Sequence, residues 1–150
     1  MAKSARRTLR HQYFLRAAPP KAFRAISDPK RLTRWLADTA QLTPRKGGRF
    51  SVGWRNGPTH TGKILEFSRG RSITFGWSWD GFEDVGVTRF RLSVEAKGKG
   101  TLLTVTHAGF PRTDRGNELY ESAEWGWTYF VMNLKSVLET GTDLRSKHDG

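Results

Sequence analysis

The stretch from residue 117 to residue 141 constrains the fold most, because it is the one long amphipathic segment in the sequence. Its apolar side chains recur at steps of three and four residues, the spacing that places them on one face of an α-helix. At 1.5 Å per residue such a helix is roughly 35 Å long, enough to cross a small domain. The expected buried face consists of Ala123, Trp127, Phe130, Leu134, Val137 and Leu138.

Both ends of this segment carry signals typical of helix termini. Asn117 is a suitable N-cap, and Gly141 stands where a left-handed C-cap residue is favoured. Glu118, Glu121 and Glu124 lie in the early turns, where the helix dipole favours negative charge. We therefore expect one long helix here, lying on a sheet formed by the preceding chain.

The preceding chain alternates apolar and polar residues in short runs, the pattern of half-buried strands. Between the first two runs, Pro19 opens one short helix and Asp28 caps a second. The later runs are joined by short turns, which predicts an antiparallel meander. The expected strands cover residues 8–17, 41–43, 49–55, 59–68, 72–79, 87–96 and 101–109.

A sheet with one apolar face has to cover that face, and the long helix is the element able to do so. The pattern therefore predicts an α+β fold with a curved antiparallel sheet and a pocket between helix and sheet. One run leaves its inward face undecided, because Ile64, Leu65 and Phe67 are apolar on both sides of the strand.

Composition narrows the functional classes. A chain of 150 residues predicts a single domain, and the absence of cysteine excludes disulfides and cysteine metal sites. The basic N-terminus is not followed by an apolar segment, and no run approaches 18 apolar residues. We therefore expect neither a signal peptide nor a membrane span, and a cytoplasmic location.

The net charge of +12 raises the possibility of a nucleic-acid partner. The basic residues, however, are distributed over all the expected loops and do not gather on one element. The sequence also lacks a basic stretch interleaved with aromatics, as RNA-binding sheets have. We therefore interpret the charge as a solvated basic surface and do not expect nucleic acid as the partner.

Three segments resemble a known superfamily. Residues 19–36, PPKAFRAISDPKRLTRWL, resemble the opening of START-like (SRPBCC, helix-grip) proteins. Residues 100–110, GTLLTVTHAGF, and 125–145, WGWTYFVMNLKSVLETGTDLR, resemble the last strand and closing helix of one branch. That branch is named for the C-terminal domain of the activator of the ninety-kilodalton heat-shock chaperone's ATPase. The resemblance covers about residues 9–145.

The resemblance implies a helix-grip fold, in which the long helix and the curved sheet enclose a hydrophobic cavity. On this basis we expect a flexible arm over residues 1–7, one START-like domain over 8–145 and a flexible tail over 146–150. Members of the superfamily bind lipids, sterols, polyketides or plant hormones, and some catalyse cyclisations. The eukaryotic activators of this branch also carry an N-terminal chaperone-binding domain.

The residues expected to line the cavity follow from strand and helix phase. His107 and His11 are the polar candidates, able to hydrogen-bond a ligand or to act as a general base. Ordinary core packing is the alternative for the aromatics, and a hydrogen-bonded buried ring is the alternative for each histidine. His60, beside a turn, is expected to be solvated. The candidate cavity residues are His11, Tyr13, Trp54, Phe75, Trp77, Phe90, His107, Trp127 and Phe130.

Other chemistries lack support in the sequence. It contains no G-x-S-x-G elbow, no cysteine nucleophile, no HExxH and no histidine pair at metal-ligand spacing. Residues 97–100 are glycine- and lysine-rich but belong to a hairpin turn, not a phosphate-binding loop. We therefore expect no metal or other cofactor and find no catalytic constellation.

Four functions remain open at this stage. The first is binding of a hydrophobic, aromatic or lipid-like small molecule, which predicts an enclosed pocket larger than about 300 Å³. The second is a co-chaperone activity on a heat-shock ATPase, exerted through the surface. The third is an enzyme that uses His107 or His11 on a hydrophobic substrate, and the fourth is nucleic-acid binding. Either a monomer or a homodimer is compatible with the sequence.

Overall fold

The computed structural model describes residues 6–147. The other residues, 1–5 and 148–150, include most of the expected arm and tail and lie outside the described part of the chain. The strands are β1 (Arg7–Leu15), β2 (Thr39–Leu42), β3 (Arg49–Gly53), β4 (Thr59–Ser68), β5 (Ser72–Trp77), β6 (Thr88–Lys97) and β7 (Gly100–Phe110). The helices are α1 (Pro19–Ser27), α2 (Pro29–Leu32), α3 (Asp114–Thr140) and a final 3₁₀ turn, η1 (Leu144–Lys147).

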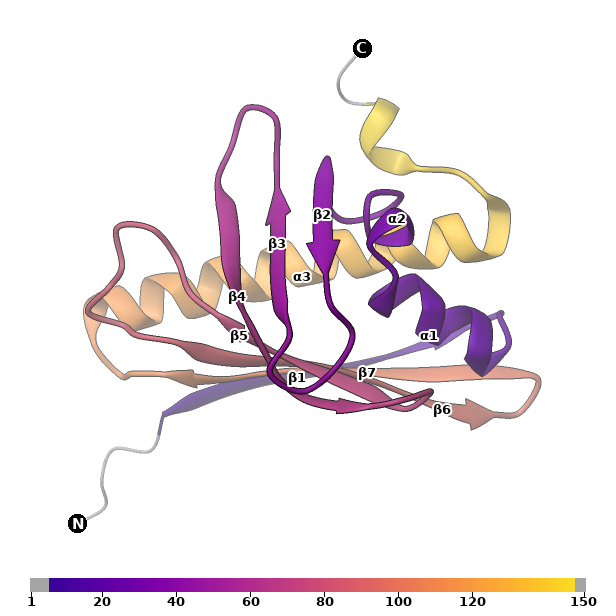
Figure 1. The fold of residues 1–150 in the computed structure, drawn as a ribbon, viewed down its shortest axis with the longest axis horizontal. Helices are drawn as coiled ribbons and strands as arrows, with labels where there is room; N and C mark the ends of the chain where they lie inside the picture. Colours follow the sequence, from indigo (N-terminus) through magenta and orange to yellow (C-terminus); the bar gives the residue numbers. More distant parts are fainter. Residues whose placement is uncertain (1–5, 148–150) are drawn as a thin grey trace.

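The seven strands form one antiparallel sheet in the order β1-β7-β6-β5-β4-β3-β2. The meander runs from β2 to β7, and β1 then pairs with β7, so that β1 and β2 are the two edges. Figure 1 shows α3 lying across the curved sheet, with α1 and α2 beside its C-terminal half. This α+β architecture confirms the helix-grip fold predicted from the sequence.

Strand alternation divides the sheet into a core face and an outer face. Leu9, His107, Phe90 and Phe75 are aligned across β1, β7, β6 and β5, and all four are buried. The residues between them along each strand point the other way, because successive side chains in a strand alternate. The core face packs against α3.

A bulge in β4 resolves the ambiguity of that strand. Ile64 is aligned with Phe75 and Glu66 with Thr74, so one extra residue, Leu65, interrupts the register. The interruption shifts the phase of the strand, and Ile64 on one side of it is 1% exposed. Strict alternation could therefore not assign the inward face of this run.

The long helix begins four residues earlier than the sequence predicted. The side chain of Thr113, not that of Asn117, caps it, with the Gly116 N–H donating to Thr113 Oγ1 at 3.0 Å. Gly141 ends it at φ 79°, the left-handed C-cap expected from the sequence. Its buried face contains three of the predicted residues, Ala123, Trp127 and Leu134. It also contains Gly116, Leu119, Val131 and Asn133, whereas Phe130, Val137 and Leu138 are only partly buried.

A buried amide fixes the C-terminal half of α3 to the rest of the fold. Asn133 is 1% exposed, and its Nδ2 donates to the Trp35 carbonyl and to Asp143 Oδ1, both at 3.0 Å. Its Oδ1 accepts from the Leu144 N–H at 2.7 Å. One side chain thus joins the helix to the α2–β2 connection and to the segment that follows the helix.

No helix within the described residues is both long enough and apolar enough to cross a membrane.

Candidate functional site

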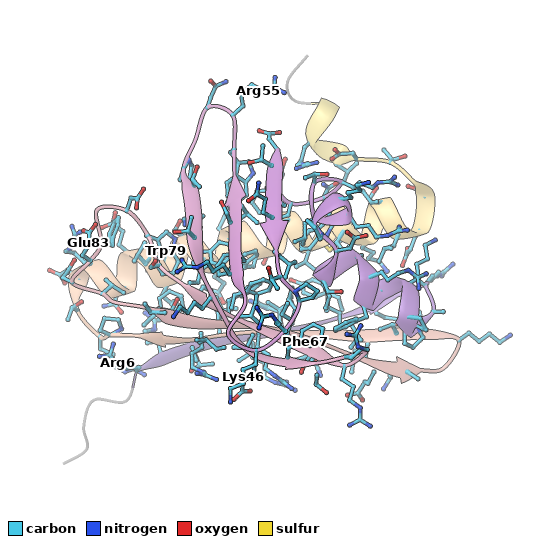
Figure 2. All side chains as sticks on the ribbon, in the orientation of Figure 1. Arg6, Lys46, Arg55, Phe67, Trp79 and Glu83 are labelled. Carbon is cyan, nitrogen blue, oxygen red and sulfur yellow. The ribbon has the colours of Figure 1, made fainter. Side chains whose placement is uncertain are left out.

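An open cleft of about 940 Å³ lies where the β3–β4 hairpin faces α3. Trp54 and His60 line it from the hairpin, and Tyr129 and Phe130 line it from the helix. Figure 2 shows Arg55 at the outer tip of this hairpin, near the C-terminal segment. The remaining lining residues form a polar rim and are Asp38, Arg55, Asn56, Gly57, Pro58, Asp143 and Arg145.

A smaller inner pocket of about 110 Å³ adjoins the cleft. Trp54, His60 and Phe130 line both spaces, which makes the inner pocket the deep end of the cleft. Its other walls are Leu36, Trp77, Trp79, Ser122, Ala123, Gly126 and Trp127. Neither space is the enclosed pocket above about 300 Å³ that the sequence led us to expect, because the larger is open and the inner one is smaller.

Gly126 leaves the inner pocket open on the helix side. A Cβ built at Gly126 meets no atom within 4 Å, so no sheet residue occupies that position. The missing side chain therefore corresponds to free space in the pocket.

His60 is the polar group shared by the cleft and the inner pocket. The sequence predicted a solvated ring, but His60 is 7% exposed, packed 4.8 Å from the Trp77 ring centre and 5.9 Å from that of Trp54. Its Nδ1 lies 2.9 Å from the Ser78 carbonyl oxygen, which can only accept, so Nδ1 carries the proton. Burial lowers the pKa of His60, although the Ser78 bond and the charge of Asp80 oppose the shift.

A neutral His60 with a proton on Nδ1 has a lone pair on Nε2. Among residues 6–147 this nitrogen has no hydrogen-bond partner. The site therefore offers one hydrogen-bond acceptor within a predominantly aromatic wall.

The cleft walls are held by bonds to the neighbouring backbone. The indole N–H of Trp54 donates to the Leu36 carbonyl at 2.9 Å, and the Arg55 N–H donates to Asp38 Oδ2 at 2.7 Å. At the other end, Arg145 donates to both carboxylate oxygens of Asp143, at 3.0 and 2.9 Å. These bonds lower the pKa of Asp143 to about 2, so this rim carboxylate is charged at neutral pH.

His107, the leading polar candidate from the sequence, lies in the core and away from the cleft. It is fully buried, and Trp127 Nε1 donates to its Nδ1 at 2.9 Å. Nε2 must then carry the proton and donates to Thr88 Oγ1 at 2.6 Å, and Thr88 donates onward to the Trp77 carbonyl. Burial lowers its pKa to about 3. Both ring nitrogens already form hydrogen bonds, so His107 is the hydrogen-bonded buried ring that was the alternative to a ligand-binding or catalytic histidine.

The structure separates the other candidates into three groups. Trp54, Trp77, Trp127 and Phe130 line the cleft or the inner pocket. Phe75 and Phe90 are core residues, with Phe90 stacked on Trp127 at 3.8 Å between ring centres. His11 and Tyr13 are partly buried on β1, where His11 Nε2 lies 3.5 Å from Glu124 Oε2 on α3, and neither lines the two spaces.

Three lining aromatics, His60, Trp79 and Tyr129, were not among the sequence candidates. Trp79 follows β5, where Figure 2 labels it, and its ring stacks on that of His107 at 5.6 Å. His60 precedes Ile64 by four residues on β4 and shares its face, but the sequence left the inward face of this strand undecided, so phase alone could not place His60. Within the described residues no group of three His, Asp or Glu side chains could hold a metal ion.

Comparisons with known proteins agree with this fold. The sequence profile of the family described as "Activator of Hsp90 ATPase homolog 1-like protein" matches residues 16–139. A search of curated proteins found no match.

Several solved structures share the fold at low sequence identity. Protein MLL2253 from Mesorhizobium loti is 22% identical, with a TM-score of 0.81 over 92% of this chain and 100% of that one. The Aha1 dimer from Colwellia psychrerythraea is 18% identical, with a TM-score of 0.78 over 91% and 98%. DynU16, a putative protein in the dynemicin biosynthetic locus, is 22% identical, with a TM-score of 0.78 over 91% of this chain and 48% of that one.

Proposed function

The chain belongs to the Activator of Hsp90 ATPase homolog 1-like family, and on that premise we propose that it binds a small, flat, largely apolar molecule in the cleft between α3 and the β3–β4 hairpin. The ligand places an apolar end in the inner pocket and a hydrogen-bond donor, such as a phenolic hydroxyl, against His60 Nε2.

The observation that carries this proposal is the continuity of the two spaces through Trp54, His60 and Phe130. The inner pocket, at about 110 Å³, compares with about 30 Å³ for one water molecule in the liquid and admits only a small group. The cleft, at about 940 Å³, lies within the usual range of about 300–1,000 Å³ for ligand sites. A ligand of this kind is therefore bound at one end and partly exposed at the other.

Aromatic walls favour a flat ligand over an aliphatic one. Trp54 and Phe130 have ring centres 5.7 Å apart, and both rings border the cleft. Aromatic faces and edges pack well against another ring, with an attraction beyond that of the buried area alone. Within these walls the free Nε2 of His60 is an acceptor, so His60 favours a ligand that donates a hydrogen bond.

Tryptophan fluorescence tests the proposal, because four tryptophans border the site. Trp54 borders both spaces, and the inner pocket is also lined by Trp77, Trp79 and Trp127. The protein is titrated with flavonoids, aromatic polyketides, fatty acids and sterols. We expect saturable quenching by the flat phenolic compounds and weaker or no response to the others. The proposal is wrong if the folded protein responds to none of the four classes.

Gly126→Leu is the matched variant, since it fills the free space at Gly126 without meeting another residue at Cβ. The control is Thr128→Leu, which adds the same side chain to an exposed position two residues further along α3. Quenching should be lost in Gly126→Leu and kept in Thr128→Leu, with both proteins folded by circular dichroism. Equal binding by the two variants would place the ligand elsewhere.

A second function has its own observation, an aromatic patch on the outer face of α3. Trp125 is 74% exposed and stacks parallel to Tyr129 at 5.8 Å, and Met132 follows on the same face, also exposed. An exposed apolar group of this kind is typical of a contact surface for another protein. Together with the family, it supports a co-chaperone role on a heat-shock ATPase.

The co-chaperone role predicts that the purified protein raises the ATPase rate of the chaperone. Trp125→Ala should reduce the stimulation, whereas Gly126→Leu, which alters the cleft, should leave it unchanged. No stimulation over a range of protein concentrations would remove this second function and would leave the ligand-binding proposal untouched.

A further inference from the structure

A second hollow, of about 700 Å³, lies on the outer face of the sheet, and the proposed function gives it no role. Strands β1, β6 and β7 and the turn before β5 supply most of its lining. Side chains of this face project away from α3, on the lower side of the sheet in Figure 2. The lining consists of Arg10, Gln12, Pro19, Gly70, Arg71, Arg91, Ser93, Val94, Glu95, Ala96, Thr104 and Thr106.

Strand register places two arginines on either side of one threonine. Arg10 on β1 is aligned with Thr106 on β7, and Thr106 is aligned with Arg91 on β6. Adjacent strands are about 4.8 Å apart, so the Cα atoms of the two arginines are about 10 Å apart. Both guanidinium groups can therefore reach a ligand that lies over Thr106.

A third arginine approaches from the β4–β5 turn. The Val94 N–H donates to the Arg71 carbonyl at 2.8 Å, which holds this turn against β6. Arg71 and Arg91 thus line the same hollow from neighbouring parts of the sheet.

The three guanidinium groups have no acidic partner within the described part of the chain. Among residues 6–147 neither Arg10, Arg71 nor Arg91 forms an ion pair, whereas Arg89, two residues before Arg91 on the same face, lies 3.4 Å from Glu66. The lining contains one carboxylate, Glu95, and therefore keeps an excess of positive charge. An unpaired guanidinium presents paired N–H donors that match the oxygens of a phosphate.

Hydroxyl groups complete the floor of the hollow. Gln12 Nε2 donates to Thr104 Oγ1 at 3.1 Å, so the Thr104 oxygen already accepts one bond. Its own proton remains free to be donated outward. Thr106 and Ser93 line the hollow beside it, which gives neutral donors between the charged ones.

We propose that this hollow binds the phosphate or diphosphate group of a small soluble molecule. Phosphate oxygens accept from all the groups described above, the guanidinium N–H donors and the hydroxyls alike. A small ligand fits better than a polymer for two reasons. The first is that the hollow is limited to about 700 Å³. The second is that the positive charge does not continue along β6 on either side of Arg91, because Arg89 is paired with Glu66 and the negatively charged Glu95 lies further along the strand.

Calorimetric titration with sodium pyrophosphate tests the site. Arg10→Gln and Arg91→Gln should each weaken binding about tenfold, as expected for one lost charge-assisted contact. Both positions are exposed, so neither change should alter the fold. The matched control is Arg89→Gln, which removes the same charge from the same strand and face but at a residue outside the hollow. Glu95→Gln should strengthen binding.

Several outcomes would overturn the proposal. One is the absence of any pyrophosphate binding by the unmodified protein, and another is an equal loss in Arg89→Gln and Arg91→Gln, which would indicate unspecific charge attraction. Parallel titrations use a single-stranded oligonucleotide and vesicles containing phosphatidylserine. Binding of either one through Arg10 and Arg91, without binding of pyrophosphate, would make this face a surface for polyanions and not a small-molecule site.

Discussion

Replacing Gly126 by alanine should stabilise the protein, although the residue borders a candidate site. Glycine in a helix interior costs about 1 kcal/mol relative to alanine, because its unfolded backbone has more freedom to lose. That gain is usually cancelled where the added methyl group collides with a neighbour. At Gly126 a Cβ meets nothing within 4 Å, so no steric cost opposes it. We expect the free energy of unfolding to rise by about 1 kcal/mol and the melting temperature by about 3 °C.

Gly116→Ala, in the first turn of the same helix, is the contrasting variant, because it adds the same methyl group where there is no space for it. A Cβ at Gly116 would overlap the carbonyl oxygen of Pro111, which belongs to the backbone and cannot rotate away. This variant should be less stable than the unmodified protein. Urea denaturation followed by circular dichroism measures both changes. A Gly126→Ala variant less stable than the unmodified protein would refute the reasoning, since it would show that the space at Gly126 is not free.

Three further predictions concern buried polar groups. Burial lowers the pKa of His107 to about 3 in the folded protein, whereas the same ring in the unfolded chain takes up a proton near pH 6.5. As the pH falls from 6.5 to 3, the unfolded chain therefore binds one more proton, and the free energy of unfolding should fall by about 1.4 kcal/mol per pH unit. Urea denaturation at a series of pH values measures this change. A flat profile from pH 6 to pH 4 would contradict it. Asn133→Ala leaves the Trp35 carbonyl and the Leu144 N–H without their partner and should cost about 2–4 kcal/mol by the same measurement. Thr88→Val keeps the side-chain shape but breaks the relay from His107 to the Trp77 carbonyl; a loss of about 1–3 kcal/mol is expected, and no loss would show that the relay contributes nothing.

The sequence was sufficient to predict the helix-grip fold because its elements are strongly periodic. The predicted strands at 49–55, 59–68, 87–96 and 101–109 correspond to β3, β4, β6 and β7 within two residues at each end. The predicted start of the long helix was wrong by four residues, since Thr113 and Asn117 are both capping residue types. Only the bond from Gly116 shows that Thr113 caps the helix.

Side-chain phase was less informative about the candidate site than about the fold. Phase indicates which face a side chain lies on, and it placed His107 and Trp127 correctly on the core face. Phase does not show whether a polar atom is already bonded, and that depends on contacts between residues far apart in sequence. Trp127 and Thr88 occupy both nitrogens of His107, 20 and 19 residues away along the chain.

The two buried histidines therefore differ in what they can do, although burial lowers the pKa of both. His107 gives one bond and receives one, so a ligand could reach it only by displacing Trp127 or Thr88 at the cost of a buried hydrogen bond. His60 uses Nδ1 for the Ser78 carbonyl, and its ring borders open space. Thr88→Val should therefore change stability and leave ligand binding unchanged. A His60→Phe variant, in contrast, should weaken the binding of phenolic ligands more than that of their non-hydroxylated analogues. Equal weakening of both kinds of ligand would show that His60 acts through its shape and not through its free nitrogen.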